Sequence, residues 1–128
     1  MVLKKDYNIL VVDDSTTNVV LLEAIFYDRG YKIDTALNAI EAFSIIDKEV
    51  PDLILLDLLM PKVSGFDFLK KLRSSKHTKD TPVIVVTAST DDENVDRIMR
   101  LGAVDYIKKP IDLKYIVDKV ESVLEQNI

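Results

Sequence analysis

The feature that most constrains this chain is a set of short runs in which every residue is apolar. They occupy residues 9–12, 53–56 and 83–86. A strand covered on one face alternates apolar and polar residues, whereas a strand covered on both faces is apolar at successive positions. These runs therefore predict the central strands of a parallel sheet with helices on both sides.

The stretches that follow the first two runs have helical periodicity and recognisable ends. A first helix is predicted over residues 16–29, with Gly30 at the left-handed position that ends many helices. Asn38 is predicted to cap a second helix, with Glu41 three residues further on. A third helix is expected after Ser64 and Gly65, with its apolar face formed by Phe66, Leu69 and Leu72.

The last two helices are predicted in the same way. Thr90 and Glu93 have the spacing of a capping box, and Gly102 is placed to end the helix that they begin. Asp112 is predicted to cap the final helix. The apolar positions of that helix have helical spacing, at Leu113, Ile116, Val117, Val120 and Leu124.

Weaker strand patterns at residues 32–36 and 104–107 complete an alternation of five strands with five helices. Such alternation is typical of an α/β fold, and 128 residues fit one domain, so we expect residues 1–128 to form a single unit. In open parallel sheets, ligands bind beyond the carboxyl ends of the strands, where the winding reverses. The residues that follow the strands are therefore the candidate site.

Aspartates stand at two of these strand ends. Asp13 and Asp14 follow the first apolar run, and Asp57 follows the run at 53–56 within an otherwise apolar stretch. A buried carboxylate is costly without a partner, and clustered carboxylates raise one another's pKa. A hard divalent cation relieves that repulsion, and an all-oxygen site with few protein ligands suits Mg²⁺.

A structural interpretation competes for one of these residues. An aspartate after a strand is often only the cap of the next helix, and for Asp14, beside Ser15 and Thr16, this interpretation is as good as the other. It is poorer for Asp57, because Pro61 disfavours helical geometry at Met60 and a loop is expected there.

The remaining strand ends carry complementary groups. Thr87 and Ala88 follow one run, and Lys108, Lys109 and Pro110 follow the last predicted strand. Taken singly, Thr87 could be an ordinary strand-end residue and Lys109 an ordinary surface charge. Three acids, a hydroxyl and an ammonium at one edge of a sheet nevertheless fit phosphoryl chemistry better than a purely structural role.

The ordered set resembles the receiver domain of response regulators over essentially the whole chain. The resemblance implies a flavodoxin-like (βα)5 fold whose five-stranded parallel sheet has the order 2-1-3-4-5, with helices on both faces. The matching residues are Asp13-Asp14, Asp57 with Met60-Pro61 and Gly65, Thr87-Ala88, Tyr106, and Lys109-Pro110.

The resemblance also implies roles for these residues. Asp57 would accept a phosphoryl group, and Mg²⁺, which Mn²⁺ could replace, would be held by Asp13, Asp14, Asp57 and the backbone carbonyl of Leu59. Leu59 and Ser89 would tune hydrolysis of the aspartyl phosphate. The chain would then be no general enzyme, since it would catalyse only its own phosphorylation and slow dephosphorylation.

By the same resemblance, Lys109, Thr87 and Ala88 would contact the phosphoryl group, and Tyr106 would turn as Thr87 moves inward. The change would reach the face formed by the fourth helix, the fifth strand and the fifth helix. The bond between Lys109 and Pro110 is expected to be cis.

The expected partners are a sensor histidine kinase or a histidine phosphotransfer protein, and a downstream protein or covalently attached output domain. A net charge of −5 argues against direct binding to nucleic acid or to an anionic membrane. There is no cysteine, no apolar stretch long enough to span a bilayer and no signal-peptide pattern, so a cytoplasmic location is expected. The sequence does not distinguish a stand-alone regulator from part of a longer protein.

Three alternatives remain at this point. A phosphatase with a nucleophilic aspartate would have its acidic pair two residues apart, whereas Asp13 and Asp14 are adjacent. A flavin-binding module would need a glycine- and hydroxyl-rich loop after the first strand, where these carboxylates would repel phosphate. A degenerate receiver that docks partners without phosphorylation is disfavoured by the full acid set.

Overall fold

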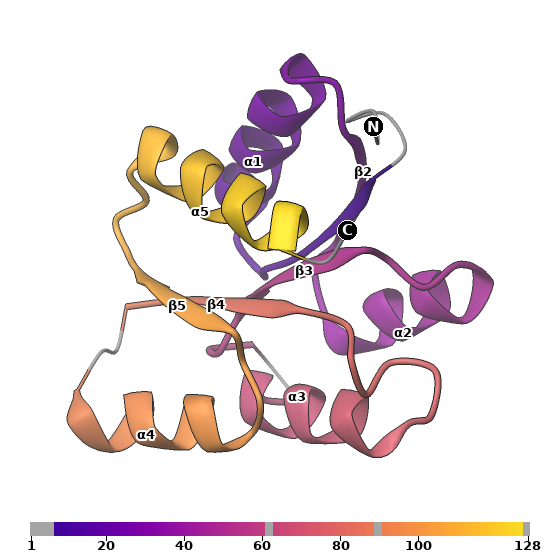
Figure 1. The fold of residues 1–128 in the computed structure, drawn as a ribbon, viewed down its shortest axis with the longest axis vertical. Coiled ribbons are helices and arrows are strands. Elements are labelled where there is room, and N and C mark those ends of the chain that lie inside the picture. Colours follow the sequence, from indigo (N-terminus) through magenta and orange to yellow (C-terminus); the bar gives the residue numbers. More distant parts are fainter. Residues whose placement is uncertain (1–6, 61–62, 89–90, 127–128) are drawn as a thin grey trace.

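The computed structural model of the chain describes residues 7–60, 63–88 and 91–126. Over these residues five strands alternate with five helices (Figure 1). The strands are β1 (Asn8–Val12), β2 (Lys32–Ala36), β3 (Leu53–Asp57), β4 (Val83–Thr87) and β5 (Asp105–Lys108). The helices are α1 (Thr16–Asp28), α2 (Ala39–Lys48), α3 (Gly65–Ser74), α4 (Asp92–Arg100) and α5 (Leu113–Gln126).

The strands form one sheet in the order β2-β1-β3-β4-β5, and every neighbouring pair is parallel. Helices α1 and α5 cover one face, and α2, α3 and α4 cover the other (Figure 1). The flavodoxin-like fold and its strand order are therefore confirmed. In the described part of the chain, no helix combines the length and apolarity needed to cross a membrane.

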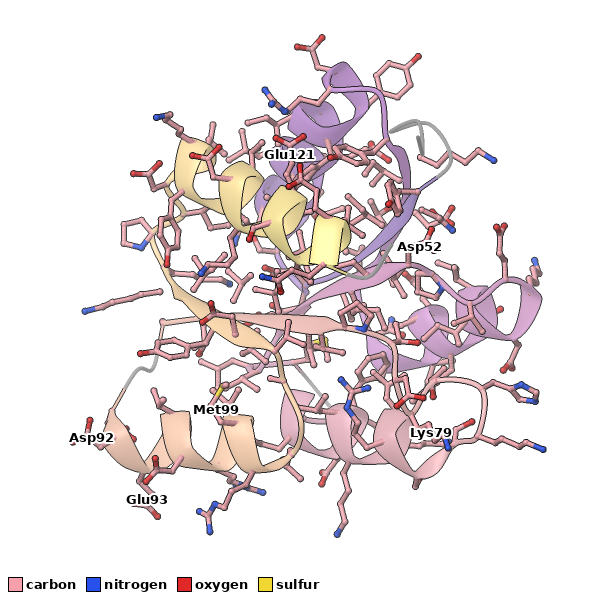
Figure 2. All side chains as sticks on the ribbon, viewed as in Figure 1. Asp52, Lys79, Asp92, Glu93, Met99 and Glu121 are labelled. Atoms are coloured by element: carbon pink, nitrogen blue, oxygen red, sulfur yellow. The ribbon has the colours of Figure 1, made fainter. Side chains whose placement is uncertain are left out.

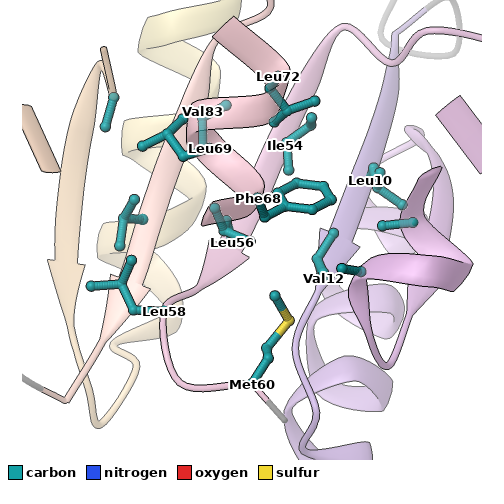
Figure 3. Packing of buried hydrophobic residues seen from close by; sticks show 14 of the residues in the cluster. Leu10, Val12, Ile54, Leu56, Leu58, Met60, Phe68, Leu69, Leu72 and Val83 are labelled. Atoms are coloured by element: carbon teal, nitrogen blue, oxygen red, sulfur yellow. The ribbon is translucent and has the colours of Figure 1, made fainter. Parts of the chain in front are cut away.

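The apolar runs of the central strands supply both cores. In β1, Leu10 and Val12 pack under α2, α3 and α4, whereas Ile9 and Val11 pack under α1 and α5. Figure 3 shows the first of these cores, in which strands β1 and β3 pack around Phe68 of α3. Burial on both faces explains why these strands lack the alternation of a half-exposed sheet.

Most of the predicted helix ends are confirmed. The predicted caps Asn38 and Asp112 accept the backbone N–H groups of residues three positions further on, at 2.9 and 3.1 Å. Helix α3 begins at Gly65, and Ser64 caps it by accepting the N–H of Asp67 at 3.2 Å. Gly30 and Gly102 have φ angles of 95° and 93°, the left-handed conformation that glycine adopts without a steric cost. Local capping chemistry thus fixes where these helices begin and end.

One detail of the prediction is wrong. The cap of α4 is Asp91, whose Oδ1 accepts the N–H of Asn94 at 2.9 Å, while Thr90 lies outside the described residues. Thr90 and Asp91 are both of a residue type that caps helices, and the helix begins one residue later than predicted. Asp92 and Glu93 follow at the N-terminal end of α4 (Figure 2), where negative charge is favourable.

The predicted apolar face of α3 is confirmed, because Leu69 and Leu72 are buried and Phe66 packs against the same core. Phe68 is fully buried in this helix, whereas Phe66 is half-buried and lies under the guanidinium group of Arg97, 3.9 Å from its ring centre. The sequence analysis did not name Phe68, which shares this buried face with Leu69 and Leu72.

A polar contact joins the two helices on the other face. Glu121 of α5 lies toward the end of α1 (Figure 2) and accepts hydrogen bonds from Arg29 at 2.9 Å and from the Tyr31 hydroxyl at 2.8 Å. Burial and this carboxylate raise the pKa of Tyr31, so the hydroxyl remains a donor.

Candidate functional site

The sheet order brings the acidic strand ends together. Strands β1 and β3 are neighbours, with Val12 opposite Leu56, so the next residues, Asp13 and Asp57, face each other across the sheet edge. One carboxylate oxygen from each of Asp13, Asp14 and Asp57 lies within 4.8 Å of the others. Within the described ranges, this is the only group of three such side chains placed to hold a metal ion.

The three carboxylates differ in exposure. Asp13 and Asp57 are 2% and 3% exposed, whereas Asp14 is exposed at the rim. The site therefore has a buried floor of two acids and an open side through which a ligand can enter.

Asp13 is held by three donors. Its Oδ1 accepts the backbone N–H of Ser15 at 2.8 Å, and its Oδ2 accepts the Lys109 ammonium at 3.2 Å and the amide of Asn18 at 3.4 Å. The sequence did not single out Ser15 or Asn18 for this role. The available signal was their distance from Asp13, two and five residues, which places both at the start of α1.

Asp57 has fewer partners. Its Oδ1 accepts the backbone N–H of Leu59 at 3.2 Å, and its Oδ2 lies 3.5 Å from the Lys109 nitrogen. The ammonium of Lys109 therefore bridges Asp13 and Asp57.

Lys109 reaches the site from the turn after β5. Its backbone N–H donates to the carbonyl of Thr87 at 2.9 Å, and the peptide bond between Lys109 and Pro110 is cis. This hydrogen bond ties the turn to the end of β4. The Lys109 side chain extends from the turn to the ends of β1 and β3.

The environment makes the Asp57 carboxylate hard to ionise. Burial raises the pKa of Asp57 to about 6, the charges of Asp13 and Asp14 add to the rise, and the Leu59 N–H and Lys109 oppose it. One ammonium faces three carboxylates, so the site favours an added positive charge. An all-oxygen donor set with this excess negative charge fits Mg²⁺.

The remaining predicted residues surround this cluster. Thr87 is fully buried at the end of β4, one residue beyond Val86, which lies opposite Asp57. Ala88 follows it and is exposed. Tyr106 lies opposite Val85, is half-buried and packs against the core under α2, α3 and α4.

Leu59 and Gly65 shape the loop after Asp57. The side chain of Leu59 is 62% exposed, and its backbone N–H donates to the Asp57 carboxylate. Gly65 donates its N–H to the carbonyl of Leu58 at 2.9 Å. A Cβ atom at Gly65 would lie 2.5 Å from the Cα of Leu58 and 2.7 Å from the Asp57 carbonyl oxygen, so only glycine allows this approach. The predicted residues Pro61 and Ser89 lie outside the described residues.

Comparison with known proteins identifies the family of the chain. The family model of the response regulator receiver domain matches residues 9–121. The response regulator PleD of Caulobacter vibrioides is 40% identical over 116 residues, which are 89% of this chain and 25% of that protein. The response regulator SaeR of Staphylococcus aureus is 33% identical over 117 residues, 91% of this chain and 50% of that protein. The chain thus spans a quarter to a half of the length of these relatives.

Solved structures show the same fold. The chemotaxis protein CheY4 of Vibrio cholerae superposes with a TM-score of 0.87 at 29% identity, covering 91% of this chain and 98% of that one. The receiver domain of a signal transduction histidine kinase from Syntrophus aciditrophicus gives a TM-score of 0.86 at 32% identity, covering 94% and 91%. On the match to the family model and on these likenesses, the chain belongs to the response regulator receiver domain family.

Proposed function

We propose that residues 1–128 act as one receiver unit in which Asp57 takes a phosphoryl group from a phosphohistidine, in a Mg²⁺-dependent reaction. The observation that carries this proposal is the convergence of Asp13, Asp14, Asp57 and Lys109 at one edge of the sheet. A family whose members are response regulators supports it.

Asp57 is suited to the nucleophilic step. A carboxylate oxygen of Asp57 attacks phosphorus, a P–O bond forms, and the P–N bond of the donor breaks. The bonding pair returns to the imidazole nitrogen, which takes up a proton. Because the pKa of Asp57 is raised only to about 6, the carboxylate is mostly ionised at neutral pH.

Lys109 has a separate part in this reaction. Its ammonium lies 3.5 Å from Asp57 Oδ2, so it would contact an oxygen of a phosphoryl group carried by Asp57. It then orients that group and neutralises part of its charge, as phosphoryl transfer requires.

Mg²⁺, which Mn²⁺ could replace, would be held by Asp13, Asp14, Asp57 and the backbone carbonyl of Leu59. When bound, the cation offsets the repulsion between the carboxylates and the phosphoryl oxygens. Asp13 and Asp14 therefore act as ligands, while Asp57 is both ligand and nucleophile.

The switch would begin at Thr87. Thr87 is buried, and its hydroxyl would donate to a phosphoryl oxygen, with Ala88 beside it. As Thr87 moves inward, Tyr106 of the neighbouring strand would turn into the space that it leaves. Tyr106 also lines a groove of about 330 Å³ between β5 and the start of α5. A downstream protein or attached output domain would read this surface, together with the neighbouring face of α4.

The phosphodonor would approach over α1. The outward face of this helix is apolar beside the acidic site, and Val20 and Leu21 are 57% and 40% exposed. A groove of about 500 Å³ follows this face along Thr16, Thr17, Val20, Leu21 and Ala24. A sensor histidine kinase or histidine phosphotransfer protein could cover it while presenting its phosphohistidine to Asp57.

The same proposal sets the limits of the activity. The domain would act on its own aspartate only, in the cytoplasm, and its net charge of −5 disfavours contact with nucleic acid or anionic membrane. Assays with small phosphate esters should therefore show no turnover.

The experiment is phosphorylation by acetyl phosphate, followed by intact-protein mass spectrometry. The unmodified chain should gain one phosphoryl group with Mg²⁺ and none with EDTA, and Asp57→Asn should gain none. Asp47→Asn, the same change at an exposed position of α2, is the matched control and should be labelled normally. Labelling of Asp57→Asn at the normal rate would overturn the proposal.

A further inference from the structure

We infer that Asn18 is a positioning residue, which holds the Asp13 carboxylate in the orientation that a divalent cation needs. This inference rests on the proposed function, because it assigns a role toward the cation of that site. It goes beyond the set of residues that the sequence identified.

Asn18 is fixed at two points. Its backbone N–H donates to Ser15 Oγ at 3.3 Å, which is the cap of α1, and its side-chain amide donates to Asp13 Oδ2 at 3.4 Å. The first contact sets the position of the residue on the first helical turn. The second extends past the cap to the acidic site, so the start of α1 and the Asp13 carboxylate are coupled.

Asp13 Oδ2 has two donors of different kind. Lys109 carries a positive charge and lies 3.2 Å away, but the same ammonium also contacts Asp57 and is needed by the phosphoryl group. When Lys109 turns to the phosphoryl group, Asn18 remains as the described side-chain donor to this oxygen. A neutral amide can hold the carboxylate without competing with the cation for its charge.

Helix α4 provides a comparison within the same chain. Asn94 occupies the same position on its helix, and it donates its N–H and its side-chain amide to Asp91 at 2.9 and 3.3 Å. That aspartate is the cap of its own helix. Asn94 therefore shares the local role of Asn18 and lacks its link to the cluster of Asp13, Asp14 and Asp57.

The experiment is a Mn²⁺ titration monitored by electron paramagnetic resonance, which reports binding without any phosphoryl transfer. Asn18→Ala should weaken Mn²⁺ binding about tenfold, as loss of an outer partner of a metal ligand does. Asn94→Ala should leave the affinity unchanged. Asn18→Gln keeps an amide donor and should bind Mn²⁺ more tightly than Asn18→Ala.

Urea unfolding without cation separates positioning from a general loss of structure. Asn18→Ala and Asn94→Ala should lower the midpoint by similar amounts, since each loses a side-chain amide contact to an aspartate at a helix start. The inference is overturned if Asn18→Ala binds Mn²⁺ as the unmodified chain does, or if Asn94→Ala weakens binding equally. It is also overturned if Asn18→Gln binds no better than Asn18→Ala.

Failure of this inference is distinguishable from failure of the proposed function. An unmodified chain that binds no Mn²⁺ at all would overturn both. Binding that Asp13→Asn abolishes and Asn18→Ala leaves intact would overturn the inference alone.

Discussion

Asp57 ends a strand in which all five residues are buried, and this setting determines its chemistry. Few contacts stabilise its charge, because the Leu59 N–H and Lys109 are its only described polar partners. The residue is therefore destabilising in the metal-free protein and useful only once a cation or phosphoryl group arrives. Such a conflict between local stability and function is expected at functional sites.

The first prediction follows from this conflict. Asp57→Asn removes a carboxylate whose pKa is about 6 in the folded chain and 3.8 otherwise. Since the folded state disfavours the charge, the variant should be more stable than the unmodified chain at pH 7, by about 1 to 3 kcal/mol. Urea unfolding in EDTA measures this difference.

The pH dependence of that difference provides the control. A raised carboxyl pKa means that the native state takes up the proton first, so the unmodified chain regains stability as pH falls through about 6 toward 3.8. The advantage of Asp57→Asn should shrink between pH 7 and pH 5. An advantage that stays constant over this range would contradict the assignment.

At the residue scale, the sequence identified the acidic residues of the site but not the side chain that positions one of them. Asp57 could be recognised because a carboxylate in an apolar stretch is conspicuous. Asn18 could not, because its role depends on a side-chain rotamer that brings its amide to 3.4 Å from Asp13. Nothing in the spacing of residues fixes that distance.

Among the elements, the loop from Asp57 to α3 depends on a single glycine. Gly65→Ala places a Cβ atom 2.5 Å from the Cα of Leu58, a backbone atom that cannot move without shifting the loop. We expect a loss of roughly 2–4 kcal/mol in unfolding free energy, as for other strongly overpacked sites, together with slower phosphorylation by acetyl phosphate.

Ser64→Ala is the matched control for that prediction. It removes the cap of α3, whose hydroxyl accepts the Asp67 N–H at 3.2 Å, and introduces no clash. It should cost about 1 kcal/mol and leave the rate of phosphorylation unchanged. Equal effects of the two substitutions on that rate would show that the loop does not depend on close packing at Gly65.

Helix α4 is held differently from the other helices, since Ile98 is its one buried residue. Arg73 of α3 compensates, because its guanidinium donates to the carbonyl of Gly102 at 3.3 and 2.9 Å and to that of Thr78 at 3.1 Å. Arg73→Leu should therefore lower stability by about 1–3 kcal/mol. The substitution should also speed amide hydrogen exchange at Val104, whose N–H donates a hydrogen bond to the carbonyl of Val83.

Arg100→Leu is the control for this prediction. Its side chain contacts only the carbonyl of Asp96 within the same helix, at 3.4 Å, among the bonds that the described residues form. Arg100→Leu should change the unfolding free energy and the amide exchange rate at Val104 much less than Arg73→Leu does. Protection at Val104 that survives Arg73→Leu would show that other contacts anchor the turn after α4.

The limits of the sequence at this scale are physical. Isolated caps such as Asn38 and Asp112 were predicted correctly, because one side chain at the right spacing decides the helix start. At the start of α4 the sequence offers two adjacent residues that could cap the helix, Thr90 and Asp91. In the structure Asp91 is the cap, because it accepts two hydrogen bonds from Asn94. Phe68 was missed because its burial depends on packing against β1 and β3.

For the whole molecule, the strand order creates the site. Asp13 and Asp57 are 44 residues apart in the sequence and meet because β1 and β3 are neighbours. The alternation of strands and helices predicted the fold class, while the particular order came from the resemblance to receiver domains. Residue spacing alone cannot select among the windings that right-handed crossovers allow.

A cation bound by three carboxylates of the native state should stabilise the whole domain. Mg²⁺ has no such site in the unfolded chain, so at one hundred times its dissociation constant it should add about 2.7 kcal/mol to the unfolding free energy. Thermal unfolding at increasing Mg²⁺ measures this gain. Asp13→Asn should abolish most of it, and a gain equal to that of the unmodified chain would contradict the site.

The central claim is that the phosphoryl group resides on Asp57, and its position can be mapped chemically. After treatment with acetyl phosphate and Mg²⁺, borohydride reduces an aspartyl phosphate to homoserine, which peptide mass spectrometry locates. We predict homoserine at position 57 and at no other aspartate. Homoserine at Asp13 or Asp14, with Asp57 unmodified, would contradict the account.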